Sequence, residues 1–279
     1  MPPVTDHDYW VLLGRFGTGK SSFASKMSPE YLVVDFDGRW PEMAGNVLGK
    51  YHIIQEPDIV KANREMVRRN PDLRGKVGTV IVDSITSILD YQQAAGRLDV
   101  ANGNGNANDI HREKADIMRV LRGSVLTYHC NGLWIAHIED GKMSGKDKTR
   151  ITIPKIELER MKINLNAILV MDIDPRSGKR YVKIDWCRYN NNVAAGQVIF
   201  DTEMWAGVPQ RISTFIRRFR GTEGYKGVAY SCEWLLAYLG SKGKPFGSVD
   251  EMKSQLGITS EPEWFNRNAW AEIAQRAGV

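Results

Sequence analysis

One short stretch, residues 14–21, restricts what this chain can fold into more than any other. Its sequence is Gly-Arg-Phe-Gly-Thr-Gly-Lys-Ser, and an apolar run at residues 9–13 precedes it. The pattern G-x-x-x-x-G-K-[ST] between a buried strand and a helix start is typical of a phosphate-binding loop. Its glycines let backbone N–H groups curl around an anion. The motif predicts nucleotide binding, and the alternative is a glycine-rich turn that binds nothing.

Each position of this loop has an expected role in binding ATP and Mg²⁺. Lys20 would reach the β- and γ-phosphates, and the Ser21 hydroxyl would bind Mg²⁺. Because the loop wraps the nucleotide with its backbone, the other expected binding residues are Gly14, Arg15, Phe16, Gly17, Thr18, Gly19 and Ser22.

The composition is that of an ordinary globular protein. The 279 residues are 42% hydrophobic and 25% charged, which is enough apolar material for a core. A net charge of +5 permits an acidic partner without requiring one. The three cysteines show no C-x-x-C spacing, so we expect neither a zinc site nor disulfides. No signal peptide or membrane-length apolar run is recognisable, and we expect a cytoplasmic protein without a membrane partner.

Apolar runs recur along the chain and alternate with helical segments. These runs lie at residues 31–34, 51–54, 79–82, 133–136 and 167–171. Near-continuous apolar strands separated by helices predict an α/β fold with a mostly parallel sheet covered on both faces. Ligands in such folds bind at the carboxyl ends of the strands. The phosphate loop, Asp37, Asp83 and His137 all fall at such ends.

Asp83 is the expected Walker B carboxylate. It follows three apolar residues of a predicted strand, and it would hold Mg²⁺ through water. An ordinary strand-end aspartate that caps the next helix is the alternative.

Water activation has to come from elsewhere, because Ser84 stands where many ATPases carry a catalytic glutamate. Asp37 is the first candidate, and Glu139 is the second. His137 ends a predicted strand, where its side chain could sense the γ-phosphate and pass that state to the following segment. The alternatives are a buried or capping role for Asp37 and a histidine satisfied by backbone groups.

Two polar segments and a C-terminal region with a different sequence pattern complete the expected organisation. Residues 96–109 and 139–152 are polar and contain glycines, so we expect two irregular loops. From about residue 230 the sequence favours short helices with capping boxes at 248–251 and 260–263. We therefore expect a core at 1–225 and a helical appendage at 226–279. The appendage would be either a binding module or a helical cap and subunit contact.

At this point the chain resembles the core of the RecA-family ATPases over most of residues 9–200. Val82-Asp83-Ser84 is similar to the family's Walker B ending, and Val34-Asp35-Phe36-Asp37 resembles the strand that ends in its catalytic acid, usually glutamate. His137 falls where the family has a glutamine sensor. A core of this length is most similar to phage single-strand annealing ATPases of the Sak-four type. The aspartate at position 37 is one methylene shorter than glutamate, a departure that bears on the efficiency of hydrolysis.

The resemblance implies a single-stranded DNA partner and assembly into a homo-oligomer, either a filament or a ring. The two polar segments fall where RecA proteins carry their DNA-binding loops, and basic residues in the second would follow the phosphate chain. A neighbouring subunit would complete the ATP site with a basic residue, for which Arg188 is preferred over Lys183. A single-strand-binding protein is a further candidate partner. The expected DNA-binding residues are Lys142, Lys146, Lys148, Arg150 and Lys155.

We therefore expect an ATPase stimulated by single-stranded DNA that acts in phage-type recombination or annealing. One alternative is a ring-forming helicase or motor on the same core. The other is a nucleotide-dependent switch or scaffold without DNA chemistry.

Overall fold

The computed structural model describes residues 7–47, 49–103, 106–143, 146–189, 194–201, 204–218, 230–262 and 267–279. Side chains are described in these ranges except at 44, 46, 107–114, 140–151, 267 and 268.

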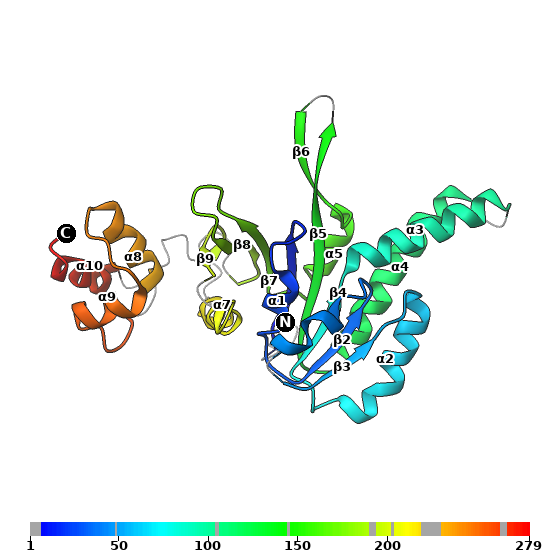
Figure 1. Ribbon diagram of the computed structural model, residues 1–279, viewed down its shortest axis with the longest axis horizontal. Helices are drawn as coiled ribbons and strands as arrows, with labels where there is room; N and C mark the ends of the chain where they lie inside the picture. The colour runs from blue at the N-terminus through cyan, green and yellow to red at the C-terminus, as the bar shows by residue number, and fades with distance from the viewer. Residues whose placement is uncertain are drawn as a thin grey trace.

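A mostly parallel sheet forms the centre of the fold (Figure 1). Its strand order is β3-β2-β4-β5-β1-β7-β8-β9, and β6 pairs with β5 off this path. The first six strands in this order run parallel, whereas β8 and β9 are antiparallel additions at one edge. The strand bounds are β1 Tyr9–Gly14, β2 Tyr31–Asp35, β3 Tyr51–Ile54, β4 Thr79–Asp83, β5 Asn131–Met143, β6 Lys146–Ile151, β7 Ala167–Ile173, β8 Arg180–Cys187 and β9 Val198–Phe200.

Helices cover both faces of this sheet, so the predicted α/β fold is confirmed. Alternate residues of β1 enter different cores, because successive side chains of a strand point to opposite faces. Val11 and Leu13 pack with α2–α5, while Trp10 and Leu12 pack with α1, η1 and α7. The bounds are α1 Lys20–Ala24, η1 Trp40–Asn46, α2 Ile59–Leu73, α3 Ile85–Ala101, α4 Ala107–Leu126, α5 Lys155–Met161 and α7 Val208–Arg217.

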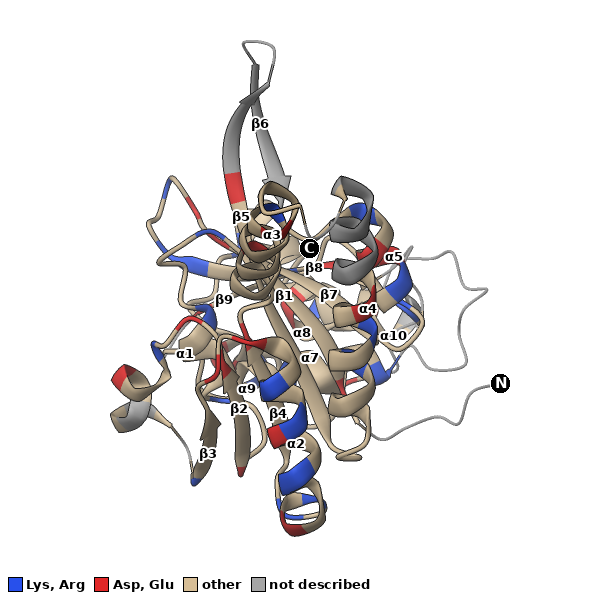
Figure 2. Cartoon of the chain, turned by 90° about the vertical axis from the view of Figure 1, so that its right-hand side faces the viewer, with Lys and Arg blue, Asp and Glu red and all other residues tan. Residues whose placement is uncertain are grey.

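Charged residues are rare along the parallel strands at the centre of the molecule (Figure 2), and β2 and β4 carry theirs at the carboxyl end, Asp35 and Asp83. On the outside of the fold, α2 carries both basic and acidic residues, with Lys and Arg more numerous than Asp and Glu. No helix in the described part of the chain is both long and apolar enough to cross a membrane.

The expectation of a loop at residues 96–109 is wrong. Residues 96–101 continue α3 and residues 107–109 begin α4, so the two helices run outward together beyond the sheet (Figure 1). Ala94, Ala95 and Leu98 are strong helix formers, and they carry α3 past the point where the polar composition suggested an end. The helix ends where Asn102 donates its N–H to the Leu98 carbonyl and Gly103 takes a positive φ of 76°.

The second expected loop is a β-hairpin. β5 continues past the sheet to Met143 and pairs with β6 in an antiparallel ladder, which projects well beyond the other strands (Figure 1). Gly141 pairs with Lys148 within this ladder. Glycine and lysine are depleted in strands, and for this reason the composition pointed to a loop.

Short helices at the C-terminal end form a core of their own. They are α8 Cys232–Ser241, α9 Val249–Leu256 and α10 Arg267–Arg276. Leu235, Met252 and Trp270 are buried among them in a cluster separate from both faces of the sheet. Half of the capping box at Ser248 is confirmed, because the Ser248 hydroxyl accepts from the Glu251 N–H, whereas the Glu251 carboxylate accepts from the Gly247 N–H. Gly257 ends the helix with φ 64°. The proposed boundary at 225/226 and Glu263 of the second box lie outside the described residues.

Candidate nucleotide-binding site

The glycine-rich loop joins β1 to α1 at the carboxyl edge of the sheet. Gly17 and Gly19 adopt φ values of 75° and 94°, which side-chain-bearing residues rarely reach. Gly14 is needed for a different reason, because a Cβ there would lie 2.7 Å from the Met171 carbonyl oxygen of β7. The Thr18 hydroxyl then donates to the Arg15 carbonyl at 2.9 Å and closes the turn. The loop therefore has the positive-φ geometry that a phosphate cradle requires.

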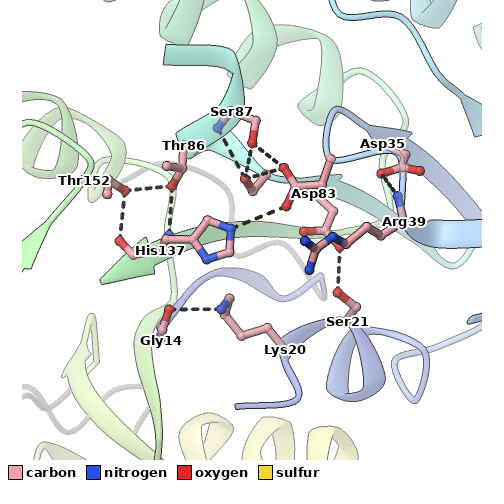
Figure 3. Close-up of polar contacts among 12 residues, drawn as sticks. Gly14, Lys20, Ser21, Asp35, Arg39, Asp83, Thr86, Ser87, His137 and Thr152 are labelled. Carbon is pink, nitrogen blue, oxygen red and sulfur yellow. Dashed lines mark hydrogen bonds and ion pairs between the residues drawn. The ribbon is translucent and has the colours of Figure 1, made fainter. Parts of the chain in front are cut away.

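Lys20 lies inside this loop rather than in solvent. It is buried, and its Nζ donates to the Gly14 carbonyl at 2.9 Å and the Arg15 carbonyl at 2.7 Å (Figure 3). Burial lowers its pKa to about 8, although Asp83 and Asp37 act in the opposite direction. A buried ammonium held by carbonyl dipoles is suited to bind a polyanion, because the phosphates would bring compensating negative charge to the buried Lys20.

Ser21 and Asp83 meet across the site. The Ser21 hydroxyl donates to Asp83 Oδ2 at 2.8 Å (Figure 3). Burial raises the pKa of Asp83 to about 7, and the Asp37 carboxylate adds to this effect. Such a pair of oxygens fits Mg²⁺, which usually takes one or two protein ligands and completes its shell with water and phosphate. The described residues contain no cluster of three metal-binding side chains.

Asp37 accepts hydrogen bonds from three side chains. Ser84 donates to its Oδ1 at 2.9 Å, Ser87 donates to the same atom, and His137 Nε2 lies 3.4 Å from Oδ2. Burial pushes the pKa of Asp37 upward, but the hydrogen bonds from His137, Ser87 and Ser84 outweigh burial and lower it to about 2. Asp37 is therefore a carboxylate at neutral pH, held in a fixed orientation at the site.

His137 is built into a network that reaches the base of the hairpin. Its backbone N–H donates to Thr86 Oγ1 at 2.8 Å, and the Thr152 hydroxyl donates to its carbonyl at 2.9 Å. The two threonine hydroxyls lie 2.7 Å apart (Figure 3). The ring itself stacks on Phe16 with centroids 4.0 Å apart, and its buried Nδ1 has no hydrogen-bond partner among the described residues.

The remaining predicted loop residues surround the same point. Phe16 is 63% exposed, and Arg15 forms an ion pair with Asp172 at the end of β7 at 2.5 Å. Ser22 lies in the first turn of α1. Glu139, the second candidate for water activation, is exposed on β5 two residues beyond His137.

Arg188 lies at the other edge of the sheet. It follows β8, whose first residue, Arg180, is at the phosphate-loop edge. Its guanidinium donates to the carbonyls of Leu165 and Lys162, both at 2.7 Å, and to that of Ile163, so it holds the chain that leaves α5. Its suggested role toward a neighbouring subunit stays a prediction.

Of the five residues predicted to bind DNA, four lie on the hairpin and one follows it. Lys142 is on β5, while Lys146, Lys148 and Arg150 are on β6. The side chains of these four lie outside the described part of the structure. Lys155 is exposed at the start of α5.

Several residues of the site have no role that the sequence motifs predicted. Asp35 accepts from the Trp40 N–H at 3.0 Å and from Gln55 Nε2 at 3.1 Å, and so fixes the segment that leads to Asp37. Arg180 and Trp205 both come close to Gly19 from distant parts of the chain. Such residues can be identified only once the strands are placed side by side.

Comparisons with known proteins were made by sequence and by structure. No family model and no curated protein matches the sequence. Among solved structures, the KaiC-like protein of Pyrococcus horikoshii OT3 aligns with 71% of this chain and 87% of its own, at 18% identity and a TM-score of 0.46. The RadB recombinase aligns with 71% and 89%, at 16% identity and a TM-score of 0.47. The fold assignment rests on the strand order and the loop geometry described above: the chain has an α/β fold with a mostly parallel central sheet and a phosphate-binding type of loop after its first strand.

Proposed function

We propose that this protein is an ATPase that binds ATP·Mg²⁺ between subunits of a homo-oligomer and grips single-stranded DNA. Its role would be in recombination or annealing of the phage Sak-four type. The observation that carries the proposal is the chain of contacts from the phosphate loop to a hairpin with several basic residues: Phe16 of the loop stacks on His137, which contacts Asp37 and, through its carbonyl, Thr152 at the base of the hairpin.

The nucleotide end of this path is supported by the fit of the loop to ATP and Mg²⁺. Lys20 would neutralise the β- and γ-phosphates, and Ser21 with Asp83 would hold the metal. When bound, Mg²⁺ supplies positive charge to the phosphate oxygens. Asp37 would orient a water molecule with the carboxylate that Ser84 and Ser87 hold in place.

The coupling step is supported by the contacts of His137. Its Nδ1 has no hydrogen-bond partner among the described residues, which leaves this ring atom open to a contact with the γ-phosphate. Any shift of the ring would also strain its backbone contacts with Thr86 and Thr152. Because Thr152 directly follows β6, we expect the nucleotide state to change the orientation of the hairpin.

The DNA-binding end is supported by the register of the hairpin. Residues 146, 148 and 150 occupy alternate positions of β6, which share one face of a strand, and they pair with 143, 141 and 139. That face carries three basic residues and one acidic residue, Glu139. Lys142 pairs with Asp147 and Asp140 with Thr149 on the other face. We therefore assign the track for the phosphate chain to Lys146, Lys148 and Arg150.

Exposed apolar side chains near the phosphate loop support a subunit contact there. Phe16 is 63% exposed, Met204 59%, Phe200 43% and Ile173 42%. A cluster of large apolar side chains on a surface is typical of a contact with another protein. A second copy of this chain covering the site would bury these residues and exclude water from the nucleotide.

The experiment that tests the ATPase function asks whether Asp37 or Glu139 positions the attacking water. Asp37→Asn is expected to lower kcat by about 10²- to 10⁴-fold and to change ATP affinity little, because a positioned carboxylate acts on the water and not on the nucleotide. Glu139→Gln, an exposed residue two positions from His137, is the matched control and should hydrolyse ATP at the wild-type rate. Steady-state hydrolysis measures kcat, and competitive binding measures ATP affinity, for both variants. A fast Asp37→Asn protein beside a slow Glu139→Gln protein would transfer the role to Glu139.

A further inference from the structure

Trp205 combines complete burial with an unused hydrogen-bond donor. Its side chain is 0% exposed, and its Nε1 has no hydrogen-bond partner in the described part of the chain. A buried N–H left without an acceptor costs free energy, and it therefore needs an explanation. An indole can only donate, so the missing partner is an acceptor.

The local structure holds this side chain in place at some cost to the backbone. Trp205 has φ 68°, a conformation that residues with side chains rarely adopt. The backbone N–H of Trp205 donates to Asp201 Oδ1 at 2.8 Å. The indole ring packs edge-on against Phe23 of α1, with ring centroids 5.6 Å apart. Asp201 in turn donates its own N–H to the Arg180 carbonyl at 2.8 Å. The β8–β9 pairing thus fixes Arg180 and Trp205 as a unit.

Both side chains border the space that the glycine at position 19 leaves open. A Cβ on Gly19 would lie 3.1 Å from Trp205 Nε1 and 3.4 Å from Arg180 Nη1. Neither donor has a hydrogen-bond or ion-pair partner among the described residues. Two donor-only groups, one of them cationic, therefore converge on the loop that would hold the nucleotide.

We propose that Trp205 Nε1 and Arg180 bind the phosphate chain of the nucleotide from the same subunit as the loop. This inference rests on the proposed nucleotide site and adds two residues to it, Arg180 of β8 and Trp205. The ligand class is a nucleoside di- or triphosphate, whose oxygens accept from both donors. Arg180 thereby contributes positive charge in cis, independently of any residue that a neighbouring subunit supplies.

The test measures nucleotide affinity rather than hydrolysis. Trp205→Phe removes the N–H and keeps an aromatic ring against Phe23, and it is expected to weaken ADP and ATP binding by about tenfold to a hundredfold. Arg180→Gln, on an exposed side chain, should weaken both by a similar factor. Calorimetry gives the affinities, and the nucleotide-induced rise in Tm checks them without turnover.

Trp10→Phe is the matched control. Trp10 is also fully buried, and its Nε1 also lacks a partner among the described residues, but it lies near the amino end of β1, away from the loop. Its replacement should leave nucleotide affinity at the wild-type value.

Two outcomes would overturn the inference. If the wild-type protein binds nucleotide and both Trp205→Phe and Arg180→Gln bind it with the wild-type affinity, these two residues do not contact the phosphates, although the proposed function stands. If wild-type protein binds no nucleotide, the proposed function and this inference fail together. If Trp205→Phe lowers the Tm of the unliganded protein, the nucleotide affinity of Arg180→Gln alone tests the inference, because the exposed Arg180 side chain does not pack in the core.

Discussion

Replacing Lys20 with alanine is expected to cause a severe loss of ATP affinity. The ammonium lies inside the loop, where it contacts the carbonyls of Gly14 and Arg15 and is shielded from water. Truncating one partner of a desolvated charge pair costs about 2–5 kcal/mol, which corresponds to a loss of affinity of about 30-fold to several thousandfold. Calorimetric titration with a slowly hydrolysed ATP analogue measures the effect.

Lys50→Ala is the control for Lys20→Ala. Lys50 is exposed just before β3, so its removal tests for a general effect of lost charge. Its affinity should equal that of the wild type, and both variants should show the wild-type circular dichroism spectrum. Unchanged ATP affinity in a folded Lys20→Ala protein would contradict the assignment of the loop as a nucleotide site.

The second large effect is expected from the hairpin. Replacing Lys146, Lys148 and Arg150 together with alanine should lower affinity for single-stranded DNA by about one to two orders of magnitude near physiological salt. Each lost phosphate contact also lowers the slope of log affinity against log salt by about 0.7, so the triple variant should lose about 2 from this slope. Fluorescence anisotropy of a labelled oligonucleotide across a salt series measures both quantities.

A triple variant of α2 serves as the charge-matched control. Lys61, Arg64 and Lys76 are exposed on or just after this helix, and replacing them removes the same charge from another part of the surface. This control should keep the wild-type affinity and slope. Equal losses in both triple variants would mean that net charge alone attracts the DNA. No loss in the hairpin variant would remove the hairpin from the DNA-binding surface.

The features that the sequence predicted well are local ones. The glycine-rich loop needs positive φ at Gly17 and Gly19, and this need appears directly as glycine in the motif. Asp83 could be placed because an apolar strand ends in it, and parallel strands bring their carboxyl ends to one edge. The register confirms that edge, since Gly14 aligns with His137 on β5 and Asp35 with Asp83 on β4.

The features that the sequence did not predict depend on packing between distant segments. Lysine and glycine in residues 139–152 favour a loop by composition, and only the pairing of β5 with β6 reveals the hairpin. Arg180 and Trp205 lie more than 150 residues from Gly19, and no spacing rule connects them. No spacing in the sequence indicates that the Arg188 guanidinium binds the backbone carbonyls after α5.

The most direct test of the proposed function is the rate of ATP hydrolysis with and without single-stranded DNA, with Lys20→Ala as the negative control and electron micrographs of the same samples. We expect slow hydrolysis alone, a clear increase with DNA, and filaments that form only when nucleotide and DNA are both present. Stimulation accompanied by closed rings would instead favour a helicase or motor. A rate that no nucleic acid changes, together with no DNA binding at low salt, would contradict the proposal and favour a nucleotide-dependent switch.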